Sequence, residues 1–199
     1  KTHNMLCKLK IQNKLHSFTD TKNSIGVIHI VRDPRNVISS LVNHFSYKST
    51  DSALKFMMNE NQTMGIEDNK VPQFLSSWKN HYNSWKRFPK NYLLIKYENL
   101  IDDPKKEVKK IIEFLNNFFR INISDNNLNN VISNSSFENI KNLETKGLFD
   151  ESAKDKNTGK VKNFFYLGKE NNWKRMLNKN ILNKLEKNFQ TEMKELGYM

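Results

Sequence analysis

One arginine and one serine in this sequence have the spacing of an anion-binding pair. Arg32 ends a short apolar stretch, and Ser40 follows eight positions later, about two turns into a segment of helical pattern. A guanidinium and a hydroxyl that converge at the start of a helix suit a phosphate, because arginine offers paired, charge-assisted hydrogen bonds. An Arg-Asp turn is also common as a purely structural feature, so the residues alone leave both interpretations open.

The elements that would position this pair form a strand–turn–helix unit. Residues 26–31 are a nearly continuous apolar run, which is typical of a strand covered on both faces in a parallel sheet. Pro34 suits the first turn of a helix, and in open α/β sheets ligands bind at the carboxyl ends of strands, where Arg32 stands. The apolar residues that recur at helical spacing after it are Val37, Ile38, Leu41, Val42 and Phe45.

A second strand–turn–helix unit lies in the middle of the chain. Residues 92–97 read as its strand, while Asp103 can cap the following helix and Pro104 can start it. Between the two units the pattern predicts helices over residues 51–59 and 71–88. Strands that alternate with helices predict an α/β fold with a P-loop-like parallel sheet flanked by helices, and the chain length suits a single domain.

The C-terminal part combines a polar stretch with an amphipathic helix. Residues 146–160 are polar and without periodicity, and we expect a mobile loop of the kind that often covers a ligand. The final helix is expected to stop near Gly197. The apolar residues on its one face, which we expect to pack in the core, are Ile181, Leu182, Leu185, Phe189, Met193 and Leu196.

Composition favours a basic globular protein without identifying its partner. The formal net charge is +12, and 11% of the residues are aromatic, which argues against disorder throughout the chain. The lysines are spread along the chain, so the charge fits a solvated basic surface as well as a polyanion groove. Cys7 is the one cysteine, which favours a reducing, cytoplasmic location, and no stretch has the length of a membrane span.

Several short motifs, taken in order, resemble those of the sulfotransferases that use 3′-phosphoadenosine 5′-phosphosulfate (PAPS) as sulfuryl donor. Arg32 and Ser40 are similar to that family's 3′-phosphate-binding pair. The other matches are Lys1-Thr2-His3, Tyr97-Glu98-Asn99-Leu100 with Asp103-Pro104, Ser135-Ser136-Phe137, Phe165-Tyr166-Leu167-Gly168 and Asn172-Trp173-Lys174. Each motif is weak alone, whereas their common order along essentially the whole chain is specific.

The resemblance implies a role for individual residues. His3 would be the general base that accepts the proton of the acceptor hydroxyl, and Lys1 would neutralise charge on the transferring sulfuryl group. His81 would lie on a helix that lines the acceptor side, although a structural role competes with substrate binding. No metal is implied. The implied contacts to PAPS, with the two aromatic rings against the adenine, are Arg32, Ser40, Tyr97, Phe137, Gly168 and Lys169.

The sequence departs from the family pattern in two places. The family's first strand and 5′-phosphosulfate loop would precede Lys1, so we expect a sheet without its central strand, exposed apolar surface and poor PAPS binding by this chain alone. Tyr166 and Leu167 stand where many relatives carry Arg-Lys, and Lys162, Lys169 or nearby backbone amides are candidate replacements. The expected acceptor is a small molecule or a carbohydrate, and the oligomeric state stays open.

Two other functions compete with sulfuryl transfer. A basic nucleic-acid-binding module would fit the charge of +12, but it calls for a groove of lysines and exposed aromatic rings, and we expect no nucleic-acid partner. A P-loop kinase would share the sheet and the phosphate-binding turn, but it needs an acidic Mg²⁺ ligand at a strand end, where Arg32 stands beside Asp33.

Chelation of divalent metals separates the kinase from the sulfotransferase. We expect transfer from labelled PAPS to be unchanged by EDTA, because sulfuryl transfer from PAPS needs no metal. No transfer from PAPS, together with phosphoryl transfer from labelled ATP that EDTA abolishes and Mg²⁺ restores, would instead favour the kinase.

Overall fold

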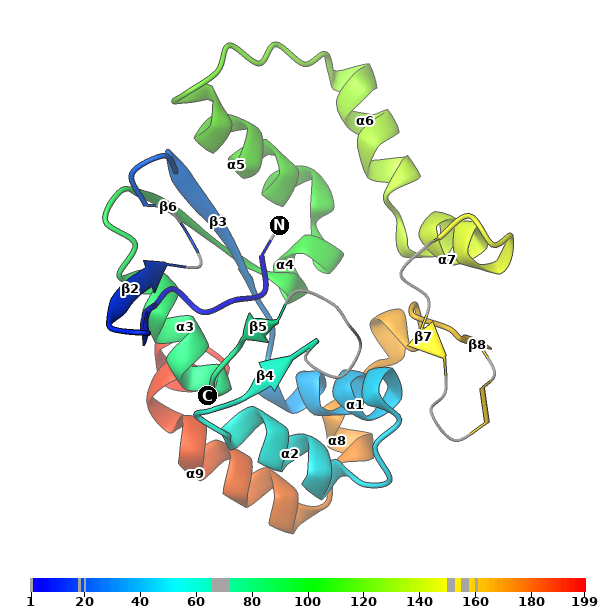
Figure 1. Ribbon diagram of the computed structural model, residues 1–199. Helices are drawn as coiled ribbons and strands as arrows, with labels where there is room; N and C mark the ends of the chain where they lie inside the picture. The colour runs from blue at the N-terminus through cyan, green and yellow to red at the C-terminus, as the bar shows by residue number, and fades with distance from the viewer. Residues whose placement is uncertain are drawn as a thin grey trace.

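The computed structural model describes residues 2–17, 19, 21–65, 72–149, 153–154, 158–159 and 161–199 (Figure 1). Its centre is a parallel pair of strands, β3 (Gly26–Val31) and β6 (Asn91–Lys96). The register runs from Gly26 opposite Asn91 to Val31 opposite Lys96, so both strands end at the same level. The predicted α/β fold with a parallel sheet flanked by helices is confirmed. The second strand ends one residue earlier than expected, because Tyr97 already begins a helix.

Helices follow both central strands and cover them. Pro34 and Pro104 each stand at the start of a helix, and the side chains of Asp33 and Asp103 cap these helices, as the sequence predicts for Pro34, Asp103 and Pro104. The helices are α1 (Pro34–Phe45), α2 (Thr50–Met58), α3 (Trp78–Lys86), α4 (Tyr97–Asp102), α5 (Pro104–Asn116), α6 (Asp125–Asn134), α7 (Phe137–Thr145), α8 (Trp173–Met176) and α9 (Lys179–Glu195), with a 3₁₀ turn, η1 (Gly168–Glu170).

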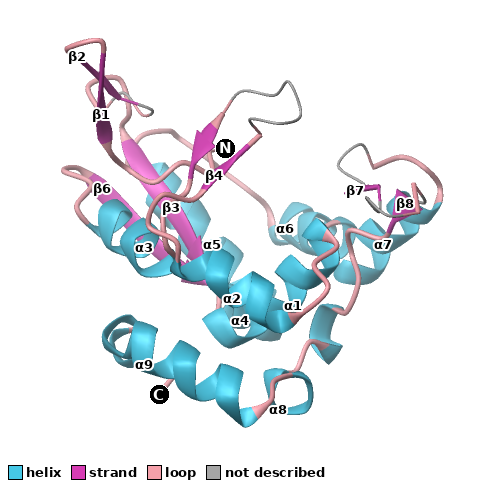
Figure 2. Cartoon of the chain, turned by 60° about the horizontal axis from the view of Figure 1, so that its bottom comes forward, coloured by secondary structure: helices cyan, strands magenta, loops and turns pink. Residues whose placement is uncertain are grey.

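Three short antiparallel pairs lie outside the central sheet. Figure 2 shows the first of them projecting from the body of the molecule, and the third lies beside α7. The pairs are β1 (Lys8–Ile11) with β2 (Lys14–Ser17), β4 (Thr63–Met64) with β5 (Gln73–Phe74), and β7 (Ala153–Lys154) with β8 (Val161–Lys162). The loop predicted over residues 146–160 falls partly outside the described residues.

The helix predicted over residues 71–88 is wrong in its first half. Gln73 and Phe74 form β5, and the helix begins only at Trp78. Ser76 has a positive φ of 59°, which no helix allows, and the Ser77 hydroxyl accepts a hydrogen bond from the backbone of Asn80 as the helix cap. The apolar spacing alone did not reveal this break.

The main core lies between α9 and the pair α1–α2. Figure 1 shows α9, in red, running beneath α2. The predicted apolar face of α9 is confirmed, and Gly197 follows the helix with a φ of 68°. The buried residues of this core are Ile38, Ala53, Leu54, Met57, Ile181, Leu185, Phe189 and Met193.

The central strand β3 is open at one position near its carboxyl end. His29 and Val31 are buried, whereas Ile30, which points to the opposite face, is 54% exposed. The expectation of a strand covered on both faces fails at Ile30 only, because Ile28 on the same face is half-buried and Gly26 lies beside the Phe114 ring of α5. The exposure of Ile30 agrees with the expected open apolar surface.

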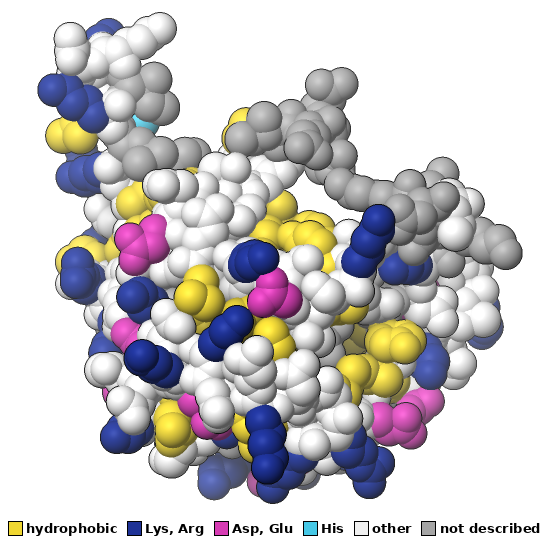
Figure 3. Space-filling model, turned by 90° about the horizontal axis from the view of Figure 1, so that it is seen from below, with side chains coloured by type: hydrophobic (Ala, Val, Ile, Leu, Met, Phe, Trp, Pro, Cys, Tyr) yellow, Lys and Arg dark blue, Asp and Glu magenta, His cyan; other side chains and the backbone are white. Residues whose placement is uncertain are grey.

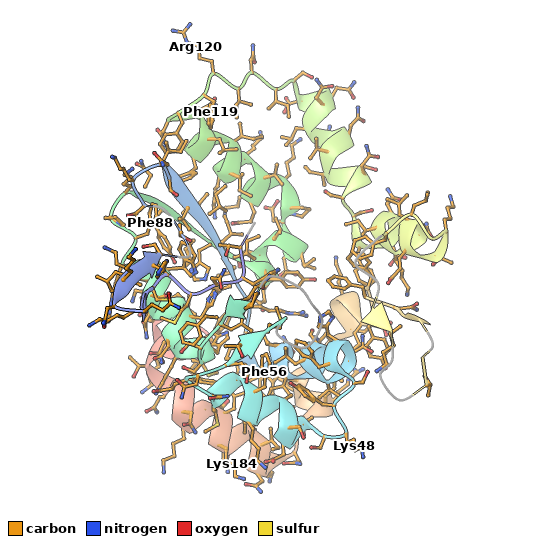
Figure 4. All side chains as sticks on the ribbon, viewed as in Figure 1. Lys48, Phe56, Phe88, Phe119, Arg120 and Lys184 are labelled. Carbon is orange, nitrogen blue, oxygen red and sulfur yellow. The ribbon has the colours of Figure 1, made fainter. Side chains whose placement is uncertain are left out.

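The surface carries its positive charge in a dispersed form. Figure 3 shows Lys and Arg side chains spread over one face, with acidic and apolar side chains between them. Figure 4 shows Lys184 on the outer side of α9, and Phe119 and Arg120 pointing outward after α5. None of the helices described is both long and apolar enough to span a lipid bilayer.

Candidate functional site

The register of the central sheet brings the first two predicted cofactor residues together. Because Val31 is paired with Lys96, the residues that follow, Arg32 and Tyr97, leave the sheet side by side. The Arg32 guanidinium carbon lies 4.3 Å from the centre of the Tyr97 ring, which is a cation–π contact. Tyr97 is the first residue of α4, so its position follows from the end of β6.

The guanidinium of Arg32 also reaches Ser40, as the spacing predicts. Its Nη1 donates a hydrogen bond of 3.1 Å to Ser40 Oγ on α1. Its Nε is buried and has no hydrogen-bond partner among the described residues. An unpaired buried donor costs about 1–3 kcal/mol, and an anion bound at this place would supply the missing acceptor.

Arg35, three residues after Arg32, has its positive charge neutralised by carboxylates. Arg35 is buried and forms ion pairs with Asp33 at 2.7 Å and with Glu186 at 3.0 Å, while its planar group stacks 4.1 Å from the Trp173 ring. Arg32 makes no ion pair with any described residue. Of these two arginines, Arg32 is therefore the one whose positive charge can be neutralised by a ligand.

The backbone beside Arg32 is held by the Glu98 carboxylate. Glu98 belongs to one of the matched motifs, but no role was predicted for it from the sequence. One oxygen of Glu98 accepts a hydrogen bond from the Asp33 amide at 2.9 Å, and the other accepts from the Tyr198 hydroxyl at 2.9 Å. Burial, and then the nearby Glu98 carboxylate, raise the pKa of Tyr198, so its hydroxyl remains a donor. Tyr198, near the C-terminus, thus helps to hold both strand ends.

Asn171 completes this corner, and it was not singled out from the sequence. Its amide nitrogen donates to Ser40 Oγ at 3.3 Å and to the Asn36 carbonyl at 3.0 Å, and its oxygen accepts from Ser39 at 2.6 Å. The adjoining segment, matched only as Asn172-Trp173-Lys174, is held to α1 by this side chain. A polar residue just before the matched motif was the only available signal.

Phe137 and Gly168 are brought together by close packing. Gly168 has a φ of 52°, and a β-carbon at this residue would lie 2.7 Å from the Phe137 ring. The Phe165 ring meets Phe137 edge-on at 6.1 Å, and the buried Glu144 carboxylate accepts a 3.0 Å hydrogen bond from the Phe165 amide. No ring contact between Tyr97 and Phe137 occurs among the described residues, so the two rings flanking an adenine stay a prediction.

Of the two lysines considered as replacements for Arg-Lys, Lys162 is engaged elsewhere. Its ammonium donates to the Asn43 carbonyl at 3.3 Å and to Ser46 Oγ at 3.0 Å, at the end of α1 remote from Arg32. There it lines, with Tyr166, an open surface hollow of about 380 Å³. Lys169 is exposed on η1, directly after Gly168, and its contact with a phosphate stays a prediction.

The structure brings His3 and His81 into direct contact. His81 Nε2 lies 3.2 Å from the carbonyl oxygen of His3. Burial lowers the pKa of His81. Behind it lies His29, whose ring is 5.9 Å away and bonds the Tyr92 hydroxyl at 2.8 Å. Burial and then His81 lower the pKa of His29 to about 4, and the predicted core role of His29 is confirmed. Lys1 lies outside the described residues.

Taken together, these features define an α/β protein with a candidate anion site at the ends of two parallel strands. Comparisons with known proteins make the assignment more specific. A family model described as a sulfotransferase domain matches residues 3–197, and the chain belongs to that family. No three His, Cys, Asp or Glu side chains of the described ranges are grouped so that they could hold a metal ion.

Individual relatives agree with this assignment. The chain is 23% identical over 176 residues to cytosolic sulfotransferase 6 of Arabidopsis thaliana, covering 86% of this chain and 52% of that protein. It is 31% identical over 135 residues to sulfotransferase 2A1 of Homo sapiens, covering 67% of this chain and 44% of that protein. The chain thus spans about half the length of the curated relatives it matches.

A solved structure shares the fold. Mouse sulfotransferase SULT7A1, crystallised in complex with PAP, superposes with a TM-score of 0.55 at 20% sequence identity. The match covers 83% of this chain and 57% of the mouse protein.

The contact between Gly168 and Phe137 can be tested by stability measurements. We expect Gly168→Ala to destabilise the protein by about 1–3 kcal/mol for the positive φ and by about as much again for the overlap with the ring. Gly147→Ala is the matched control, because Gly147 has a φ of 71° but nothing within 4 Å of an added β-carbon. Urea unfolding of both variants measures the difference, and equal losses would contradict the packing described.

Proposed function

We propose that the whole protein transfers a sulfuryl group from PAPS to a hydroxyl or amine acceptor. The observation that carries this proposal is the state of Arg32. Within the described part of the chain, Arg32 has a buried donor without a hydrogen-bond partner and a charge without a paired carboxylate, and it is held between Ser40 and Tyr97 at the strand ends. Because the chain belongs to the sulfotransferase family, we propose that the anion is the 3′-phosphate of PAPS.

The residues at the strand ends fit the 3′-phosphate and adenine of PAPS. Arg32 would supply charge-assisted hydrogen bonds to the phosphate, and Ser40 would add a hydroxyl. The Tyr97 ring offers an apolar face next to this phosphate, as an adenine requires. Gly168 and Lys169, on the segment that Asn171 ties to Ser40, and Phe137, which packs against Gly168, are proposed as further contacts.

His3 is proposed as the general base, with Lys1 beside it. PAPS supplies, when bound, an activated sulfuryl group and a good leaving group. A neutral imidazole at His3 would accept the proton of the attacking hydroxyl, and the Lys1 ammonium would stabilise negative charge near the reacting oxygen. His3 is exposed, so its imidazole is accessible to an acceptor from solvent.

The acceptor is proposed to be a small molecule or a carbohydrate, and the location to be the cytosol. Two of the relatives bear names that support these proposals. One is called cytosolic sulfotransferase 6, and another, from Flaveria chlorifolia, is called flavonol 4′-sulfotransferase and is 25% identical over 177 residues. An assay with labelled PAPS and three acceptors tests this proposal. The acceptors are p-nitrophenol as a phenol, glucosamine as a sugar and a long-chain alcohol as a lipid-like hydroxyl.

Arg32→Ala tests the cofactor site. We expect the affinity for PAP, measured by calorimetry on the whole protein, to fall by about 10–100-fold, because charge-assisted hydrogen bonds contribute about 1.5–3 kcal/mol. Lys184→Ala is the control, since it removes one positive charge from the outer side of α9 (Figure 4). Equal affinities of the two variants would show that PAP does not use Arg32.

His3→Ala tests the catalytic base. We expect turnover with labelled PAPS to fall by about 10²–10⁴-fold, because general base catalysis contributes about that factor. PAP affinity should stay at the level of the unaltered protein, since His3 is assigned to the acceptor. Full turnover in this variant would remove His3 as the base while leaving the PAPS site unaffected.

A further inference from the structure

The segment that carries His3 is held by the side chains of one helix. Residues 2–7 form no strand, so no β-ladder fixes their backbone in the described structure. Three side chains of α3, spaced as i, i+3 and i+4 and therefore on one face, bond that backbone instead. The bonds are His81 Nε2 to the His3 carbonyl at 3.2 Å, Trp85 Nε1 to the Asn4 carbonyl at 3.0 Å, and the Leu6 amide to Ser84 Oγ at 2.9 Å.

A second anchor fixes the same segment from β5. The Asn4 side chain accepts a hydrogen bond from the Phe74 amide at 2.7 Å, and the Met5 amide donates to the Phe74 carbonyl at 2.8 Å. These bonds constrain Asn4 and Met5. At His3 itself, the contact from α3 is made by His81.

α3 is a rigid support for this contact. Tyr82 and Trp85 are buried with exposed fractions of 3% and 5%, and Ser77 caps the helix start. Tyr82 and Lys86 both bond Glu195 near the end of α9. The position of His81 is therefore set by the same core that holds α9 and α1.

The His81 side chain can act as a hydrogen-bond donor while it is uncharged. A carbonyl oxygen only accepts hydrogen bonds, so Nε2 of His81 must carry the proton. Burial lowers the pKa of His81, and its neighbour His29 is also neutral near pH 7. The contact therefore places no positive charge beside the His3 backbone.

We propose that His81 is a positioning residue that directs the His3 imidazole through its hydrogen bond to the His3 carbonyl. This proposal rests on the proposed role of His3 as the base. It differs from the substrate contact expected from the sequence, because the described partner of His81 is the protein backbone. Small errors in the placement of a reacting group lower rates steeply, by about 10²-fold for 1 Å.

His81→Leu and His81→Gln separate positioning from mere packing. Leucine removes the donor, whereas the side-chain amide of glutamine can again donate to the His3 carbonyl. With labelled PAPS and the most active of p-nitrophenol, glucosamine and the long-chain alcohol, we expect kcat to fall by about 10–100-fold in His81→Leu. Most of that loss should be recovered in His81→Gln. The KM for the acceptor and the affinity for PAP should stay constant in both variants.

Lys79→Ala is the control on the same helix, because Lys79 faces Glu60 rather than the His3 segment. Without PAP, the imidazole resonance of His3 in an NMR spectrum should move in His81→Leu and stay in place in Lys79→Ala. A raised acceptor KM at constant kcat would overturn the proposal and make His81 a substrate contact. Equal losses in the Leu and Gln variants would also overturn it.

A double variant distinguishes failure of this proposal from failure of the proposed base. If His81 acts through His3, His81→Leu should cause little further loss in a His3→Ala background, because the group it positions is gone. Additive losses would overturn the positioning role while leaving His3 as the base. Full turnover of His3→Ala alone would instead remove the base itself. If His81→Leu unfolds, His81→Asn is the second variant, because its amide nitrogen matches the position of Nδ1 and not that of Nε2; the same fall in kcat is expected, and an unchanged kcat would overturn the proposal.

Discussion

The parallel pairing of β3 with β6 is the constraint on which the rest of the structure depends. Its register ends both strands at one level, so Arg32 and Tyr97 emerge side by side and α1 and α4 start next to each other. A shift by one residue would turn every side chain of a strand to the opposite face of the sheet. The contact between the Arg32 guanidinium and the Tyr97 ring and the bond from the Asp33 amide to Glu98, which join the two strand ends, would be lost with it.

Arg32 and Arg35 differ in whether a carboxylate of the described residues neutralises their charge. Arg35 is neutralised by Asp33 and Glu186 and donates to the Tyr198 carbonyl at 2.6 Å, so it ties the end of the chain to the start of α1. Among the described residues, this leaves Arg32 in place but without a counter-charge. An anion site needs a fixed cation whose own ion pairs do not compete with the ligand, and Arg32 meets that requirement in the proposed site.

Sequence patterns predicted the parts of the molecule whose structure is decided locally. Pro34 and Pro104 mark helix starts because proline fixes φ, and the face of α9 follows from helical periodicity alone. Ser76 broke the predicted helix because a positive φ at serine leaves no pattern in the sequence. Asn171 was missed because it lies 131 residues after Ser40 in the sequence. The two residues meet only when the chain folds back onto α1. The exposure of Ile30 likewise depends on which elements cover β3.

The two halves of the proposed site are supported by different kinds of structure. The anion half stands at the ends of paired strands and is closed by Glu98 and Tyr198, so its geometry is fixed by the same cooperative contacts that hold the core. The His3 half has no β-ladder within the described structure and depends on a few side-chain hydrogen bonds from α3 and β5. Individual hydrogen bonds contribute only about 0.5–1.5 kcal/mol each, so substitutions on α3 can displace His3 without unfolding the domain around it. We therefore expect the proposed cofactor binding and the proposed turnover to be separable by substitution.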